Sequence, residues 1–295
     1  MNIKEEIYRI AGFLVRRLKL YNYFELKDDS RPAFPVRLVF LCGREGIRYL
    51  NACMVSIYRH WDELPDICVV TDGTPLEMFQ KDLIRWPRKL EIISWEECAL
   101  YFSNKGQQEL YNFANQNILG RKFASLLYFA LQGPFLYSDT DILWFDSPGA
   151  LDLTKSPLIK MSRENDRACY SDALLKALGE EKCLLTTPFN SGLMFLNGDF
   201  SSYPKWKELC QFLGTLAKDE IMAEQTAFAI LTNHFDQTSF WPSEQILIKT
   251  DDMFHWRYTR SDFPNILARH YVYTRPTAFW RDFIYMCATK NSRKL

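Results

Sequence analysis

The sequence predicts an α/β fold with a mostly parallel central sheet flanked by helices, preceded by an N-terminal helix. Two patterns lead to this prediction. Short apolar runs rich in β-branched and aromatic residues end at glycine or at polar residues, as buried strands do. Between them lie segments whose apolar residues recur at helical spacing, and this alternation is typical of parallel sheets. The chain of 295 residues, 47% of them hydrophobic, is long enough to bury one large core.

The first half of the chain alternates most regularly. Pro75 is placed to start a helix and Pro134 to end one, because proline fits the first turn of a helix and breaks its interior. The expected strands cover residues 36–42, 67–71, 90–93 and 135–137. The expected helices cover residues 47–58, 75–84 and 120–130.

The second half has the same kinds of segment in a less regular order. The expected strands cover residues 142–145, 157–161, 192–196 and 269–273. The expected helices cover residues 203–216, 224–231 and 277–287. No repeat or low-complexity segment interrupts them. We therefore expect one domain over residues 31–295, preceded by an amphipathic helix and a linker over residues 1–30.

The N-terminal helix has two interpretations. Its apolar residues recur at helical spacing and are Ile3, Ile7, Ile10, Phe13, Leu14 and Leu18. Positive charge comes from Arg9, Arg16, Arg17 and Lys19. Residues 1–20 either form a helix that lies on an anionic membrane surface or one that packs on its own domain. The sequence leaves both interpretations open.

Charge and cysteine content limit the kinds of partner that the protein can bind and indicate its cellular compartment. Lys and Arg number 36, as do Asp and Glu, so no basic field covers the whole protein and we expect no nucleic-acid partner. The 8 cysteines show no CxxC or zinc-site spacing, which favours reduced thiols in a cytoplasmic enzyme. Charged residues break every long apolar stretch, so we expect neither a transmembrane helix nor a signal peptide. A membrane-bound N-terminal helix would then lie on the inner face of that membrane.

Asp139 and Asp141 are the first candidates for chemistry. Residues two apart on an extended backbone point to the same side. Both carboxylates can then approach one hard cation such as Mg²⁺ or Mn²⁺, which prefers oxygen ligands and shares its shell with phosphates. The spacing alone also occurs in turns and helix caps. Here the pair follows an apolar strand and precedes another apolar run, and two carboxylates in such surroundings repel each other unless a cation joins them.

Three expected strands end at residues suited to ligand binding. These ends are Cys42-Gly43, Thr71-Asp72 and the stretch from Ser138 through Thr140 to Asp141. Ligands in open α/β sheets bind beyond the carboxyl ends of the strands. Asp72 fits two roles there, as a turn cap before Gly73 or as a contact to a nucleotide base or ribose. We therefore expect the binding site to be built mainly by the first half of the chain.

Residues 135–143, Phe-Leu-Tyr-Ser-Asp-Thr-Asp-Ile-Leu, resemble the metal-binding strand of GT-A-fold glycosyltransferases. The likeness is closest to the retaining group that includes glycogenin and the bacterial lipopolysaccharide galactosyltransferases. Further segments resemble that family in its own order: Lys122, residues 189–197 (Phe-Asn-Ser-Gly-Leu-Met-Phe-Leu-Asn), Glu224-Gln225 and His270. The resemblance covers roughly residues 36 to 280. It departs after His270, where the family has a Gly and a Lys-Pro-Trp and this chain has Arg275-Pro276 at shifted spacing, and at Glu224, where Asp is commoner.

The resemblance implies the GT-A fold and a set of roles. Asp139, Asp141 and His270 would hold Mn²⁺ or Mg²⁺, and Asn190, Glu224 and Gln225 would be the catalytic residues near the reacting carbon. The expected donor-binding residues are Cys42, Gly43, Asp72, Lys122, Ser138, Thr140, Ser191, Gly192 and Arg275. The implied activity is transfer of a sugar with retention, from a nucleoside-diphosphate donor such as a UDP-sugar, to a hydroxyl group of a glycan, lipid-linked or protein acceptor.

Other interpretations stay open at this stage. Cys42-Gly43-Arg44-Glu45-Gly46 is a thin version of the loop of a sugar-nucleotide-forming nucleotidyltransferase. A catalytically silent nucleotide-sugar-binding module of the same fold would carry the same residues. His270 also fits a core histidine, and Glu224 a carboxylate favoured at a helix N-terminus. Candidates for stacking on an acceptor are Trp241, Trp256 and Tyr258.

Overall fold

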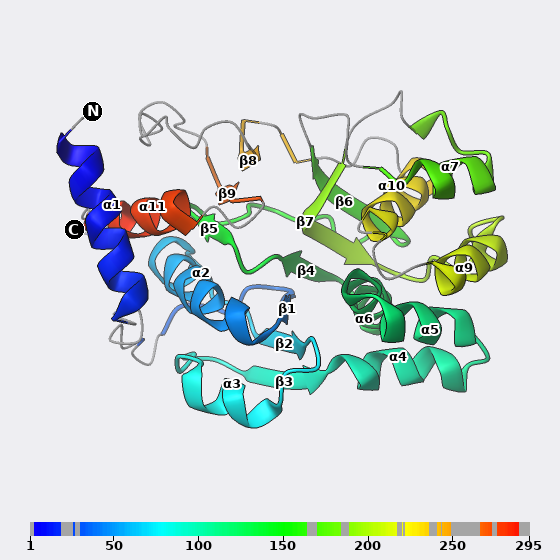
Figure 1. Cartoon of the computed structure of the whole chain (residues 1–295), viewed down its shortest axis with the longest axis horizontal. Helices are drawn as coiled ribbons and strands as arrows, with labels where there is room; N and C mark the ends of the chain where they lie inside the picture. Colours follow the sequence, from blue (N-terminus) through cyan, green and yellow to red (C-terminus); the bar gives the residue numbers. More distant parts are fainter. Residues whose placement is uncertain are drawn as a thin grey trace.

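The computed structural model describes residues 3–18, 26, 30–163, 170–183, 189–216, 220, 222–235, 241–242, 244–248, 266–272 and 276–288. A six-stranded sheet forms its centre (Figure 1). In spatial order its strands are β3 (Leu90–Ser94), β2 (Ile67–Thr71), β1 (Arg37–Cys42), β4 (Phe135–Ser138), β7 (Phe189–Asn197) and β6 (Leu158–Arg163). The first four run parallel, whereas β7 is antiparallel to both β4 and β6. The predicted mostly parallel sheet is confirmed.

A second sheet has three strands, the first of which follows β4 in the chain. Its order is β5 (Ile142–Trp144), β9 (Ala268–His270) and β8 (Ile246–Ile248). The antiparallel pairing of β5 with β9 sets Ile142 opposite His270. Since Ile142 follows the Asp139–Asp141 turn directly, this pairing carries a residue from the end of the chain to the carboxyl end of β4.

Helices cover the central sheet on both sides. In chain order they are α1 (Ile3–Arg17), α2 (Ile47–His60), α3 (Leu76–Asp82), α4 (Trp95–Asn104), α5 (Gln108–Gln116), α6 (Ile118–Gln132), α7 (Asp172–Leu178), α9 (Trp206–Thr215), α10 (Ala223–Phe235) and α11 (Pro276–Ala288), with a 3-10 turn η2 (Arg44–Gly46) after β1. The predicted helices are all present, with ends that differ by a few residues. The sequence patterns predict no element at α4, α5, α7 or β8.

The core lies on both faces of the sheet because side chains alternate along each strand. On β1, Leu38 and Phe40 join the cluster beneath α2, α3 and the second sheet. Val39 joins the opposite cluster, beneath α4, α5, α6 and α10. This burial on both faces explains why β1 is a continuous apolar run.

The ends of the strands bring distant residues to one edge of the sheet. Cys42, Thr71 and Ser138 end parallel neighbours, so they share that edge. Because β7 is antiparallel to β4, its first residues, Phe189 and Asn190, lie at the same edge. No helix in the described part of the chain is both long enough and apolar enough to cross a membrane.

Candidate active site

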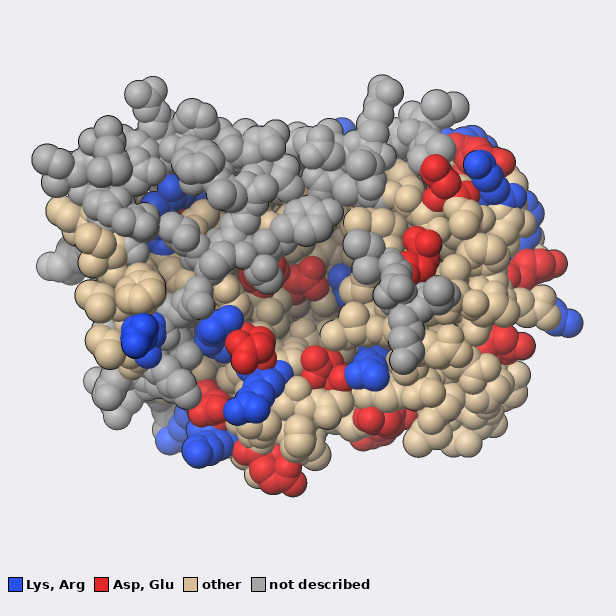
Figure 2. Space-filling view, viewed as in Figure 1, with Lys and Arg blue, Asp and Glu red and all other residues tan. Residues whose placement is uncertain are grey.

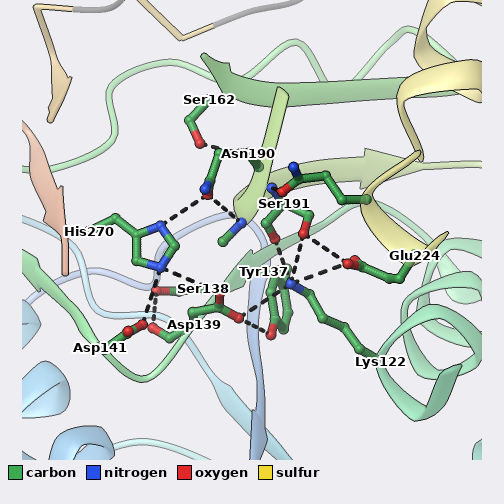
Figure 3. Close-up of polar contacts among 12 residues, drawn as sticks. Lys122, Tyr137, Ser138, Asp139, Asp141, Ser162, Asn190, Ser191, Glu224 and His270 are labelled. Carbon is green, nitrogen blue, oxygen red and sulfur yellow. Dashed lines mark hydrogen bonds and ion pairs between the residues drawn. The ribbon is translucent and has the colours of Figure 1, made fainter. Parts of the chain in front are cut away.

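The turn between β4 and β5 holds Asp139 and Asp141 at the carboxyl edge of the sheet (Figure 3). The Asp139 amide donates to the carbonyl oxygen of Gly192 on β7 at 2.7 Å. The hydroxyl of Tyr137 donates to Oδ1 of Asp139. The two aspartate side chains remain 29% and 18% exposed, so both carboxylates stay accessible at this edge.

His270 faces the two aspartates across the sheet junction. Its Nε2 lies 3.3 Å from Oδ1 of Asp141 and 3.6 Å from Oδ2 of Asp139. One ligand atom from each of the three residues lies within 4.8 Å of the others. The three residues thus offer two carboxylates and one imidazole to a single point, as the sequence analysis predicted.

The partners of His270 suit a metal ligand. Its Nδ1 lies 3.0 Å from Oδ1 of Asn190, and that oxygen also accepts the amide of Gly192 at 2.8 Å. An oxygen in this position accepts a hydrogen bond from Nδ1, so Nδ1 carries the proton and the neutral ring presents a lone pair at Nε2. Two carboxylates and an oriented imidazole together suit a divalent metal ion.

The carboxylates control the charge of His270 when it has no metal beside it. Burial alone would lower the pKa of its imidazole, but Asp141 and Asp139 outweigh burial and raise that pKa. A cation at Nε2 would take the place of this second proton. Metal and proton therefore compete for the same atom.

Gly192 explains how His270 can come so close to β7. A Cβ atom built on Gly192 would lie 2.5 Å from Nδ1 of His270. Any larger residue would force the imidazole away from Asn190 and from the aspartates. The glycine that the sequence analysis placed among the donor-binding residues thus also has a structural role beside the imidazole.

Lys122 lies buried behind the aspartates, on α6. Its Nζ donates to the carbonyl oxygen of Ser191 at 2.9 Å and to the Ser191 hydroxyl at 3.1 Å. It pairs with Oδ1 of Asp139 at 3.4 Å and with Oε1 of Glu224 at 3.6 Å. Burial alone would lower the pKa of Lys122, but Asp139 and Glu224 raise it above its ordinary value. The site therefore holds a fixed positive charge.

Glu224 and Gln225 begin α10 and hold β7 from the other side. The Ser191 hydroxyl donates to Oε2 of Glu224 at 2.9 Å, and the Ser191 amide donates to Oε1 of Gln225 at 3.0 Å. Burial raises the pKa of Glu224 to about 7, although Lys122 and Ser191 pull it down. The Glu224 side chain is only 2% exposed, so it orients Ser191 and Lys122 and presents no surface to a substrate.

An open pocket of about 670 Å³ lies beyond the ends of β1, β2 and β3. Its lining includes Arg44, Asp72, Trp95 and Arg121. Arg121 lies over the ring of Trp95 at 4.5 Å and donates to the carbonyl oxygen of Asp72. Figure 2 shows one face of the molecule, which is hollowed near its centre and carries acidic and basic side chains in and below the hollow. Sequence reasoning missed Arg121 and Trp95, although one adjoins Lys122 and the other directly follows a strand end.

The remaining expected donor-binding residues differ in access. Gly43 lies so close to the Asp72 carboxylate that a Cβ would overlap it. Thr140 is partly exposed next to Gly46. Cys42 and Ser138 are buried, so their side chains support the edge from below and offer no contact surface to a donor.

The residues expected at the periphery of the site fall into two groups. Trp241 is only 2% exposed, so the expectation that it stacks on an acceptor is wrong. Arg275, Trp256 and Tyr258 lie outside the described residues.

The fold is similar to that of solved glycosyltransferase structures. No family model and no curated protein matches the chain. Among solved structures, the galactosyltransferase LgtC in complex with donor and acceptor sugar analogues has a TM-score of 0.53 at 16% identity, over 88% of this chain and 98% of LgtC. The apo-form glycosyltransferase GlyE of Streptococcus pneumoniae TIGR4 has a TM-score of 0.51 at 16% identity, over 86% of this chain. The match spans 60% of GlyE, less than two thirds of that protein. Together with the sheet order, these likenesses show that the chain has the GT-A fold of glycosyltransferases.

Proposed function

We propose that this protein is a metal-dependent glycosyltransferase that moves a sugar from a UDP-sugar to a hydroxyl acceptor with retention. The observation that carries the proposal is the convergence of Asp139, Asp141 and His270, with Lys122 directly behind Asp139. A divalent cation there would neutralise the charge that develops on a departing diphosphate. The neighbouring open pocket beside Asp72 and Arg121 would take the nucleoside.

The chain's own residues have distinct tasks in this reaction. The bond between the anomeric carbon and the diphosphate oxygen breaks while the acceptor oxygen bonds to that carbon. Lys122 supplies a fixed charge that favours the developing anion. Glu224 and Gln225 hold Ser191, so the start of β7 keeps its position beside the sugar. Asn190 keeps His270 in the tautomer that a metal needs.

Retention is supported by the described residues, none of which offers the acceptor a separate base. Among the described histidines, only His270 lies here, and it faces the aspartates. The carboxylate of Glu224 is buried between Ser191 and Lys122. In the retaining arrangement the acceptor enters on the face from which the diphosphate leaves. The proton of the acceptor hydroxyl then goes to the departing diphosphate oxygen.

The acceptor and the compartment are part of the same proposal. LgtC was solved with donor and acceptor sugar analogues, so we propose a glycan as the acceptor class. Apart from Cys183, the described cysteines are free thiols, and all of these but Cys287 are buried. Free thiols fit a reducing compartment, which supports the cytoplasm as the place of the reaction.

A thermal-shift panel of nucleotide-sugars, with and without Mn²⁺, tests the proposal. A ligand at one hundred times its Kd stabilises the fold by about 2.7 kcal/mol, so a UDP-sugar with Mn²⁺ should raise Tm measurably. The variant Asp139→Asn with Asp141→Asn should lose the metal-dependent part of that rise. The matched control, Asp152→Asn with Asp199→Asn, removes two exposed carboxylates elsewhere and should keep it.

Turnover assays of the same nucleotide-sugars, read beside the thermal shifts, separate the alternative functions. Sugar transfer or donor hydrolysis with Mn²⁺ supports the enzyme. Binding without any turnover would identify a silent binding module. Stabilisation by a nucleoside triphosphate and a sugar phosphate in place of a UDP-sugar would identify a nucleotidyltransferase. No stabilisation by any nucleotide would overturn the proposal.

A further inference from the structure

The N-terminal helix α1 exposes its apolar residues. Figure 1 shows α1 at the edge of the molecule, beside α11. The exposed fractions are 58% for Ile7, 51% for Ile10, 57% for Phe13, 44% for Leu14 and 57% for Leu18. We call these five residues the α1 stripe. Spacings of three and four residues place them along one side of the helix.

α1 is attached to the domain by a different side. Gly12 is buried against α11, where an added Cβ would lie 3.1 Å from Cβ of Trp280. Val15, three residues further on, packs against the main core. The helix therefore packs on its own domain and leaves the α1 stripe exposed. Five large apolar side chains in a row on a helix surface indicate a partner.

The charge around the stripe favours one kind of partner. Residues 1–20 contain Lys4, Arg9, Arg16, Arg17 and Lys19 against Glu5 and Glu6, whereas the whole chain carries equal numbers of basic and acidic residues. Arg17 is exposed, and its guanidinium lies 5.9 Å from the ring centre of Phe13 in the stripe. Basic residues beside an apolar stripe are typical of helices that lie in the interface of an anionic bilayer.

We propose that α1 docks the protein on an anionic lipid bilayer, with the α1 stripe at the boundary between head groups and acyl chains. The helix has 15 residues, fewer than the roughly 20 that would span a bilayer, so it lies parallel to the surface. A second copy of this chain is a poorer partner, because self-pairing through the stripe would oppose two basic segments. The attachment through Gly12 and Val15 leaves the stripe free while the domain stays folded.

Flotation of the full chain with lipid vesicles tests this docking without any nucleotide-sugar. We expect binding to phosphatidylcholine vesicles that contain phosphatidylglycerol, weaker binding to phosphatidylcholine alone, and release by high salt. Ile10→Asp with Leu14→Asp should weaken binding roughly tenfold or more, because apolar surface no longer enters the bilayer. The matched control is Leu100→Asp with Leu131→Asp, which changes side chains 46% and 39% exposed on α4 and α6 and should bind as the unchanged protein does.

A charge-reversal variant and a measurement of oligomeric state test the docking proposal independently. Arg17→Glu keeps the apolar side chains of the stripe and should still reduce binding to the anionic vesicles. The proposal is overturned if the unchanged protein does not float, or if the stripe variant floats as well as its control. It is also overturned if light scattering shows a dimer that only the stripe variant dissociates. Vesicle binding without sugar transfer would contradict the proposed function alone.

Discussion

The two sides of the candidate active site are built in different ways. On the metal side, Lys122, Glu224 and His270 are buried. Lys122 pairs with Glu224, and both Lys122 and His270 contact Asp139. On the other side, Asp72 and Arg121 line an open pocket. Buried charges keep their positions because every displacement leaves one of them uncompensated. The metal side is therefore set before any donor binds, whereas the open side leaves room for recognition.

Removing the buried charge of Lys122 should cause the largest loss of stability on the metal side. Lys122→Met leaves Asp139 and Glu224 without their shared cation, and breaking a buried ion pair costs on the order of 3 kcal/mol. Urea denaturation would measure this loss of unfolding free energy. Lys207→Met, on an exposed position of α9, is the control and should change it little. Equal stabilities of the two variants would show that the metal side is not held by its buried charges.

The raised pKa of Glu224 should make the stability of the protein depend on pH. Its pKa is raised from 4.5 to about 7 in the folded state, with the attraction to Lys122 already included. A raised acid pKa contributes stability below about pH 4.5 that is lost as the pH rises through about 7. Relative to the unchanged protein, Glu224→Gln should therefore be more stable at pH 8 than at pH 5, by on the order of 2 kcal/mol. Urea denaturation without metal measures this difference. If the two proteins differ in unfolding free energy by the same amount at pH 5 and pH 8, the raised pKa of Glu224 is contradicted.

Gly192 tests whether close packing positions the metal ligand. The methyl group of Gly192→Ala would displace the ring of His270 from Asn190. We expect Mn²⁺ affinity to fall tenfold or more, about 1.4 kcal/mol, as for residues that orient metal ligands. Calorimetric titration with Mn²⁺ measures this affinity. An unchanged affinity in a folded variant would separate Gly192 from the metal site.

A substitution in the open pocket should have the smallest effect, a modest loss of UDP affinity. Asp72→Asn removes a charge that faces the pocket while its size stays the same. UDP affinity should fall about fivefold, the loss expected when one hydrogen bond to a charged group weakens. Mn²⁺ affinity in the absence of UDP should stay the same. A loss of Mn²⁺ binding would mean that the two sides are not separate.

How well each side of the site could be predicted from the sequence depends on how far apart in the sequence the contacting residues lie. The apolar runs and their polar ends predicted β1, β2 and β4 because local pattern decides buried strands. The meeting of His270 with Asp139 depends on the pairing of β5 with β9, which the sequence analysis reached only through family resemblance. Arg121 was missed because its role depends on Trp95, which α4 and α6 bring beneath it. Similarly, the apolar pattern of α1 predicted a helix but could not show which side packs.

The most direct test of the central claim is the coordination of Mn²⁺ by Asp139, Asp141 and His270. Pulsed electron paramagnetic resonance detects the coupling of bound Mn²⁺ to a ligand nitrogen. We expect coupling to one imidazole nitrogen in the unchanged protein and in the control His234→Gln, and its loss in His270→Gln. Bound Mn²⁺ without nitrogen coupling, or coupling that survives His270→Gln, would contradict the account.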